Sequence, residues 1–406
     1  MTALATELFA LCLYGPALVL LHEAGHAAFA RLGGYRVTSF GIGLGRPLWS
    51  VYVRDGVVIH LDRWLIAGGA CTAVPLGPPG PRRAWFHGGG LLVQLALAAL
   101  LFVLPASWLV ERVAAFNLLV AATNILPWKT RAQASDGWYL LDALAGGRRM
   151  GHPLGQRAHL RRMLARELAA NSPVGVAYCD VVLAWSDVQL GQLDSGHQRL
   201  VDAAPQATRE PWIDALHHLV RAEWHRAKGE PQEALQAVRR GQALEGLDAD
   251  ARALLDHGEA RALVDAGQPD RARETLARVV GHAGLLGNQA AVTLLQAELA
   301  GALGPEDRAN LEHATWRVER RILDGFLDPV DTLIALHRAA AALQAAGLVR
   351  AARGALASAT TLRERTVSRA GVRETAWADA QVQRHVGQLA AGPDDPGALG
   401  APSSWW

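Results

Sequence analysis

The chain has 406 residues, half of them hydrophobic and 19% charged, with a formal net charge of +2. This apolar content excludes intrinsic disorder. The near-neutral charge gives no support for nucleic-acid binding, which needs a concentrated basic face, so we expect no nucleic-acid partner. Three scattered cysteines (Cys12, Cys71 and Cys179) are too few for a disulfide framework or a thiolate metal site. Any metal must therefore be held by histidines and carboxylates.

Charge is unevenly distributed along the chain. Residues 1–150 contain 12 Lys and Arg and 7 Asp and Glu, whereas residues 151–406 contain 28 and 31. These counts make the first part about 13% charged and the second about 23%, against roughly 25% for a typical soluble protein. The first part therefore has the composition of a membrane domain, and the second that of a soluble one.

Three apolar stretches of the first part are candidate membrane spans, which need about 20 predominantly apolar residues. They are residues 8–32, interrupted by a few polar side chains, residues 84–110, without a charged residue, and residues 113–128. A signal peptide is the alternative for the first stretch, but Glu7 stands where its basic region should be. We predict a three-span membrane core.

Arginine and lysine near the span ends predict the orientation. Six arginines lie in residues 32–83, and four basic residues lie in residues 129–149, whereas none precedes the first span. The N-terminus is therefore predicted outside, and the 32–83 loop and everything after Trp128 in the cytoplasm.

A small cytoplasmic β-hairpin is predicted in the loop between the first two spans. Apolar and polar residues alternate over 50–54 and 57–61, and an Asp-Gly pair at 55–56 is a strong hairpin signal.

The first span contains the sequence His-Glu-Ala-Gly-His, from His22 to His26. Helix positions i and i+4 share a face, so both imidazoles can bind one metal ion, and zinc favours this ligand type. Glu23 is close enough to take a proton from an activated water. A chance pair of helix histidines is the alternative, but ionisable residues within a span are costly and mark functional sites.

A catalytic zinc site needs a third protein ligand. Asp136 is the best candidate, because it follows the third span at the same predicted cytoplasmic face as His26. Asp142 and Glu111 are alternatives. The predicted topology places Glu111 on the opposite side of the membrane, and Asp142 lies deeper in the following helical run. Asp136 and the glycine after it could instead form only a turn or a helix N-cap.

Together these residues resemble the site-2 protease family of intramembrane zinc metalloproteases, over about residues 1–147. The family motifs are H-E-x-x-H, N-x-x-P followed by D-G, and often G-P-x-x-N. The matching segments are His22–His26, Asn124-Ile125-Leu126-Pro127, Asp136-Gly137 and Gly90-Leu91-Leu92-Val93-Gln94. Gln94 takes the place of Asn, Leu91 that of Pro and Ser135 that of a Leu, and the interval between Pro127 and Asp136 is longer than in the compact form of the motif.

The resemblance implies one catalytic Zn²⁺ held by His22, His26 and Asp136, with Glu23 as the general base. It also implies that Asn124 and Gln94 position the substrate or its oxyanion. The expected activity is hydrolysis of peptide bonds in membrane-associated proteins or peptides. We hypothesise that an extended substrate pairs with the predicted hairpin as an added strand, so that proline at Val57 or Ile59 would impair cleavage without removing zinc. The simplest members of the family suggest a bacterial inner-membrane location in contact with the lipid bilayer.

Consecutive helices rich in Ala, Leu, Arg, Glu and Gln are predicted over residues 155–391. Glycines recur in similar settings at intervals of 38, 38, 37 and 43 residues, namely Gly191, Gly229, Gly267, Gly304 and Gly347. This period is close to that of tetratricopeptide repeats and predicts a cytoplasmic, tetratricopeptide-like α-solenoid that binds a protein partner. A plain helical bundle is the alternative. The tail, 392–406, is predicted to be mobile.

We therefore expect a mainly α fold with three domains: a membrane-embedded zinc metalloprotease domain (1–147), the helical repeats (155–391) and the tail. The alternative function is a catalytically inactive, membrane-tethered interaction scaffold. The complete set of two histidines, a glutamate and an aspartate argues against it. A metal transporter or sensor is not supported by three short spans.

Overall fold

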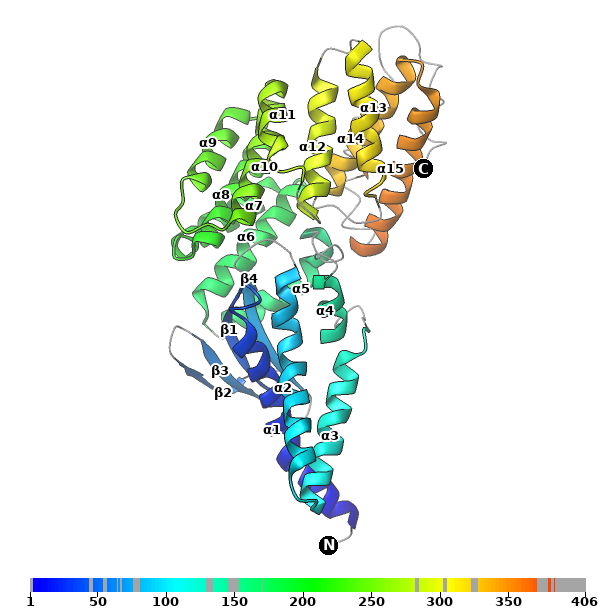
Figure 1. The fold of residues 1–406 in the computed structure, drawn as a ribbon. Helices are drawn as coiled ribbons and strands as arrows, with labels where there is room; N and C mark the ends of the chain where they lie inside the picture. Colours follow the sequence, from blue (N-terminus) through cyan, green and yellow to red (C-terminus); the bar gives the residue numbers. More distant parts are fainter. Residues whose placement is uncertain are drawn as a thin grey trace. The chain divides into compact units, whose positions relative to one another are not determined.

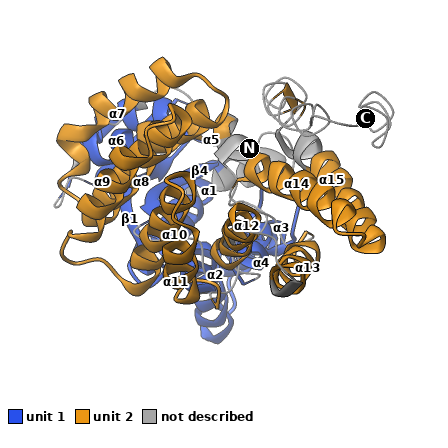
Figure 2. Cartoon of the chain, turned by 90° about the horizontal axis from the view of Figure 1, so that it is seen from above, with its two compact units in different colours: residues 1–147, 161–179 blue, residues 148–160, 180–406 orange. Residues whose placement is uncertain are grey.

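The computed structural model describes residues 3–43, 47–53, 57–63, 65, 68–75, 81–128, 134–144, 153–169, 171–281, 285–301, 305–322, 328–370, 379–380 and 383. This described part is mainly helical, with fifteen α-helices and a four-stranded sheet (Figure 1). The chain divides into two compact units, residues 1–147 with 161–179 and residues 148–160 with 180–406 (Figure 2). The predicted domain boundaries stay predictions, and the predicted mobile tail, 392–406, lies outside the described residues.

Four helices form the helical part of the first unit. They are α1 (Ala3–Phe29), α2 (Ala84–Val103), α3 (Trp108–Ile125) and α4 (Asp136–Leu144). Helix α2 lies between α1 and α3 and contacts both, and it also contacts α4 (Figure 1). A short 3₁₀ turn, Pro81–Arg83, leads into α2.

Two helices of the described residues are long and apolar enough to cross a membrane. They are Pro81–Val103 and Trp108–Ile125, with mean hydropathies of 1.9 and 1.2. Helix α3 buries only Asn117 and Ala121, whereas large apolar side chains such as Leu119 are more than half exposed. Such a surface is unfavourable in water and suited to lipid. Helix α1, whose N-terminal side chains are not described, is not one of the two, so the third span stays a prediction.

The sheet consists of β1 (Tyr35–Ile42), β2 (Pro47–Tyr52), β3 (Val58–Asp62) and β4 (Gly69–Pro75), in the order β2-β3-β1-β4. Strands β2 and β3 pair antiparallel, β3 pairs parallel with β1, and β1 pairs antiparallel with β4. Helix α1 packs against β1 and β4. The free edges of the sheet are therefore β2 and β4.

The predicted hairpin exists as the β2–β3 pair, although its Asp-Gly turn at 55–56 lies outside the described residues. The sheet is larger than predicted because β1 and β4 extend it. Ile59 lies in β3, which has a partner on each side. Proline at position 59 would remove a ladder hydrogen bond inside the sheet, so it is not a clean test of substrate pairing.

Eleven helices follow in the described part of the chain. They are α5 (Pro153–Ala169), α6 (Pro173–Gln189), α7 (Leu193–Ala207), α8 (Pro211–Ala227), α9 (Pro231–Gln242), α10 (Ala249–Asp265), α11 (Pro269–Ala277), α12 (Leu285–Ala300), α13 (Pro305–Glu319), α14 (Pro329–Ala345) and α15 (Val349–Ala370). From α7 onward each helix packs against the next, and α8, α10, α12 and α14 also pack in series. The tetratricopeptide-like solenoid itself stays a prediction.

Four of the five periodic glycines end a helix, as their spacing predicts. Gly191, Gly229, Gly267 and Gly347 have φ angles of 71°, 76°, 70° and 81°. In each case the N–H of the next residue donates to the carbonyl five positions earlier, at 2.8–2.9 Å, which is a Schellman cap. The left-handed backbone explains why glycine stands at these positions. Gly304 lies outside the described residues.

A buried ionic cluster joins three helices of the second unit. The Arg261 side chain on α10 is 4% exposed and contacts Glu223 on α8 at 3.0 Å, Asp328 at the start of α14 at 3.0 Å, and Asp331. Arg226 on α8 adds a contact to Glu223 at 2.8 Å. Each carboxylate is thus compensated by a guanidinium, as buried charges require.

Candidate metal centre

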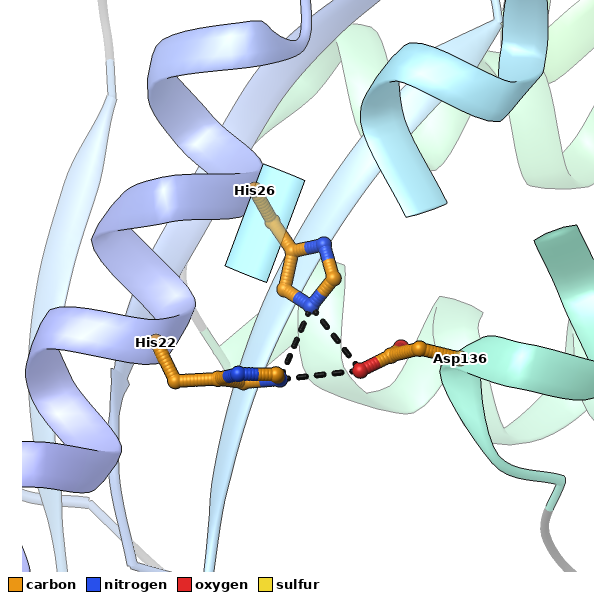
Figure 3. A group of neighbouring side chains, drawn as sticks. All are labelled: His22, His26 and Asp136. Carbon is orange, nitrogen blue, oxygen red and sulfur yellow. Dashed lines mark hydrogen bonds and ion pairs between the residues drawn. The ribbon is translucent and has the colours of Figure 1, made fainter. Parts of the chain in front are cut away.

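His22 and His26 lie one turn apart on α1, and both are buried, with 5% exposure each. Their rings stand nearly perpendicular to each other, and their Nε2 atoms are 3.1 Å apart. Asp136 approaches from α4 and places Oδ2 2.9 Å from His22 Nε2 and 3.3 Å from His26 Nε2 (Figure 3). Among the described residues, this is the one group of His, Cys, Asp and Glu side chains arranged to hold a metal ion.

Asp136 is held in place by the residues on either side of it. Ser135 is buried and precedes α4, and its hydroxyl donates to the Leu126 carbonyl at the end of α3, at 2.5 Å. The same oxygen accepts from the Trp138 N–H in the first turn of α4. A Cβ on Gly137 would lie 1.9 Å from the Ile125 carbonyl oxygen, so only glycine allows α4 to begin this close to α3. In the Asp-Gly pair, Asp136 therefore supplies the candidate metal ligand, and Gly137 allows α4 to approach α3 closely.

The Nδ1 atom of each imidazole, which points away from Asp136, makes a hydrogen bond of its own. His26 Nδ1 lies 2.7 Å from the Phe86 carbonyl oxygen, which can only accept, so this nitrogen carries the proton. His22 Nδ1 donates to Gln94 Oε1 at 3.1 Å. In the neutral imidazoles both Nε2 atoms are then unprotonated and face the Asp136 oxygen. Three acceptor atoms in contact repel one another unless a cation lies between them.

The three ligand atoms lie slightly closer together than the spacing that a tetrahedral zinc ion requires. Zn–N and Zn–O bonds of about 2.0–2.2 Å in a tetrahedron place neighbouring ligand atoms about 3.3–3.5 Å apart. The separations here, between His22, His26 and Asp136, are 2.9–3.3 Å. Burial acts to raise the pKa of Asp136, but the two imidazoles, which donate to the carboxylate when they carry a proton on Nε2, outweigh burial and keep that pKa below its usual range. The carboxyl is therefore ionised at neutral pH, as a metal ligand must be.

Glycines allow α1 and α2 to approach closely around the histidines. A Cβ on Gly25 would lie 2.7 Å from the Gly89 carbonyl oxygen, and one on Gly90 would lie 2.5 Å from the His22 ring. Gly88, on the same helix, has no neighbour closer than 3.8 Å. Gly90 therefore provides the space that the His22 imidazole occupies.

The Glu23 side chain extends from α1 towards β4, an edge strand of the sheet. Its carboxylate accepts a hydrogen bond from the backbone N–H of Cys71 on β4. A Cβ on Gly69 would lie 2.7 Å from Glu23 Cγ and 2.7 Å from Val19 Cγ1, so β4 packs directly on this turn of α1. Strand β4 therefore faces Glu23.

The structure brings His22, Glu23, His26, Asp136 and Gln94 together. Gln94 on α2 is fully buried, and its contact is with His22 rather than with open space. Its predicted contact with substrate stays a prediction.

The other predicted residues lie elsewhere. Asn124 is half-buried near the end of α3, and in the described part of the chain its side chain makes no hydrogen bond, so its role also stays a prediction. The alternative third ligands, Asp142 and Glu111, do not belong to the metal-capable group of the described residues.

The sequence reasoning assigned no role in the centre to several groups that contribute to it. They are the Phe86 carbonyl, Gly90, the Cys71 N–H, Ser135 and Asn117, whose side chain donates to the Gln94 carbonyl at 2.9 Å. The role of Gly90 could have been predicted from the Gly88–Gly90 run, because small residues within an apolar helix are typical of close helix packing in membranes. The contacts of the Phe86 carbonyl and the Cys71 N–H could not have been predicted, because any residue type has these backbone groups.

Comparison with known proteins agrees with this geometry. Residues 8–107 match the model of Peptidase family M50. The match contains His22, Glu23, His26 and Gln94, and it ends before Asp136. The M50 family comprises the site-2 proteases, whose activity depends on zinc, so a match to this family and a metal-capable group coincide in this chain. The comparisons with curated proteins and with solved structures found no match.

Proposed function

We propose that this protein is an intramembrane zinc metalloprotease that hydrolyses peptide bonds of membrane-associated proteins or peptides. The observation that carries the proposal is the meeting of His22 Nε2, His26 Nε2 and Asp136 Oδ2 within 3.3 Å, with both Nδ1 protons directed elsewhere. The M50 match over residues 8–107 supports it independently.

His22, His26 and Asp136 would hold one Zn²⁺ and leave its fourth position open, as catalytic sites do. Bound zinc polarises a carbonyl oxygen and lowers the pKa of water towards about 7. Glu23, buried beside the ligands, takes a proton from the attacking water and transfers it to the leaving amine. The Cys71 N–H restrains the carboxylate for this task. Gln94 orients the His22 ring, and such outer partners commonly determine metal affinity.

The outer edge of β4 is the proposed substrate-binding surface. A helical substrate must unwind before its scissile carbonyl is accessible, and an extended segment can then pair with an exposed strand edge. Strand β4 is an edge strand, and it contacts Glu23. A peptide substrate with N-methyl groups on alternate residues should be cleaved more slowly in one register only. Equal cleavage of the two peptides, methylated at odd or at even positions, would contradict pairing of the substrate with the β4 edge.

The membrane arrangement and the repeats belong to the same proposal. We infer three spans, α1, α2 and α3, in a bacterial inner membrane, with an outer N-terminus. The apolar surfaces of α2 and α3 support the lipid contact. We also infer that α7–α15 form a tetratricopeptide-like solenoid in the cytoplasm that recruits a protein partner or the substrate. Regular Schellman-capped turns and the packing of each helix on the next support this inference.

The test is purification of the full chain in detergent, with zinc content and cleavage of a single-span peptide measured together. Glu23→Gln should retain zinc and lose cleavage, whereas His22→Ala should lose both. Glu111→Gln, at an exposed position of α3, serves as the control and should keep both. Zinc-free wild-type protein would overturn the metal site. Wild-type protein with zinc but no cleavage of any membrane peptide would favour the inactive scaffold.

A further inference from the structure

Glu167, near the end of α5, is a fully buried carboxyl group in the first unit of the fold. Its Oε1 is 2.8 Å from the hydroxyl of Thr38 on β1, 129 residues earlier in the chain. A Cβ on Gly175 of α6 would lie 1.9 Å from its Oε2, so glycine at this position makes room for the carboxyl group. Burying a carboxyl group is costly unless it is hydrogen-bonded, so the contact with Thr38 is part of what allows Glu167 to be buried.

Thr38 lies at an irregularity of the sheet. The register between β1 and β4 shifts between Val37 and Ser39, which leaves Thr38 as the extra residue of a bulge. Its hydroxyl contacts two neighbouring groups. Besides Glu167, it reaches the backbone carbonyl of Thr72 on β4 at 3.1 Å. One side chain thus links α5 to the edge strand.

The edge strand is also the element that holds the catalytic carboxylate. Thr72 follows Cys71, whose N–H donates to Glu23, and Gly69 packs on Glu23 Cγ. A continuous series of contacts therefore runs from Glu167 through Thr38 and Thr72 to Glu23. Each step is a hydrogen bond or one residue of β4.

We propose that Glu167 is a positioning residue of the metal centre, which acts through Thr38 to fix β4 and, with it, the Glu23 carboxylate and the substrate edge. This inference rests on the proposed function. It implies that the catalytic unit extends beyond residue 147 and includes the segment 161–179.

Other contacts of the segment 161–179 support this assignment. Burial raises the pKa of Tyr139, one turn after Asp136, and Arg162 on α5 opposes that shift. Burial also raises the pKa of Tyr178 on α6, and there the opposing charge is Arg83, next to α2. Charges of this segment and of the turn before α2 therefore act on one another's neighbours, and Glu167 contacts the sheet directly.

The test uses the full chain in detergent with four single variants and the double variant that combines Glu167→Ala with Thr38→Val. Glu167→Ala and Thr38→Val each break the link, Glu167→Gln preserves its hydrogen bonding, and Leu168→Ala is a control at a neighbouring position that is 60% exposed. The measurements are zinc content, kcat and KM for a single-span peptide, and amide hydrogen exchange of residues 69–75. The exchange measurement does not depend on activity.

We expect Glu167→Ala and Thr38→Val to lower kcat about tenfold or more, because misplaced catalytic groups lose rate steeply. Both should retain zinc and show faster exchange in β4, and the double variant should be no worse than either single one. Glu167→Gln and Leu168→Ala should resemble the wild type.

A Glu167→Ala variant with unchanged kcat and unchanged β4 exchange would overturn the inference. So would loss of zinc together with activity, which indicates general unfolding, or a Glu167→Gln variant as impaired as Glu167→Ala. If the wild-type protein binds zinc but cleaves nothing, the proposed function fails, and the exchange of β4 alone then decides the role of Glu167.

Discussion

The imidazole of His22 lies directly against Gly90, where a Cβ would stand 2.5 Å from the ring Cε1 and 2.8 Å from Nε2. Gly90→Ala should therefore displace the ring and abolish stoichiometric zinc binding. Gly88→Ala is the matched control on the same helix, because its Cβ would meet nothing closer than 3.8 Å. Metal analysis of the two purified variants checks this expectation. Full zinc occupancy in Gly90→Ala would contradict the observed packing.

Gln94→Leu should weaken zinc binding without removing it. The change leaves the His22 Nδ1 proton without its acceptor, and loss of such an outer partner typically costs about 10–100-fold in metal affinity. Competition with a chromophoric chelator measures the affinity. An affinity equal to that of the wild type would show that the 3.1 Å contact does not orient the ring.

Arg261→Ala should destabilise the second unit strongly. It leaves the buried Asp328 carboxylate without its guanidinium and leaves Glu223 with Arg226 alone, and breaking a buried pair in this way costs about 3–5 kcal/mol. Arg278→Ala is the matched control, because Arg278 is 58% exposed and lies 3.3 Å from Asp256. We expect this variant to lose less than about 1 kcal/mol of unfolding free energy. Urea unfolding followed by tryptophan fluorescence gives both values. Similar losses in the two variants would refute the difference.

Glu167 should make stability depend on pH. Burial raises the pKa of Glu167 above the ordinary value of 4.5. A carboxyl with a raised folded-state pKa stabilises the fold most below pH 4.5, and this contribution is lost as the pH rises through the folded-state value. The Thr38 hydroxyl agrees with a protonated Glu167, because its single proton can then go to the Thr72 carbonyl.

Glu167→Gln cannot titrate, so its melting temperature relative to the wild type should rise between pH 4 and pH 8. Thermal unfolding at several pH values measures the difference. A constant difference across this range would show that Glu167 titrates alike in the folded and unfolded chain.

The local features of the site could be predicted from the sequence because their signals are local. The i, i+4 spacing of His22 and His26 on a helix is sufficient to place two imidazoles together. Asp136 could be assigned because an acidic residue after an apolar stretch can return to the same membrane face. The hairpin signal likewise identified β2 and β3. The periodic glycines marked real helix ends, since glycine is the residue that the Schellman cap requires.

The remainder depends on contacts between distant residues. The bulge at Thr38 and its link to Glu167 join positions 129 residues apart, and no periodicity encodes such a contact. The position of β4 as an edge strand depends on the order of the whole sheet. In the same way, Ser135 stood out only as a departure from a motif, whereas the fold uses its hydroxyl to join two helix ends.

The placement of the ligands on α1 and α4 has a consequence for folding. An ion shared by His26 and Asp136 would be a cross-link between residues 110 positions apart, which closes a loop containing the sheet, α2 and α3. Closing a loop of about 100 residues restricts the unfolded chain by on the order of 4–5 kcal/mol in the chain-entropy description of cross-links. Zinc would therefore act as a reversible cross-link within the first unit. Its removal by a chelator should release α4 from α1 before α1 or α2 unfolds.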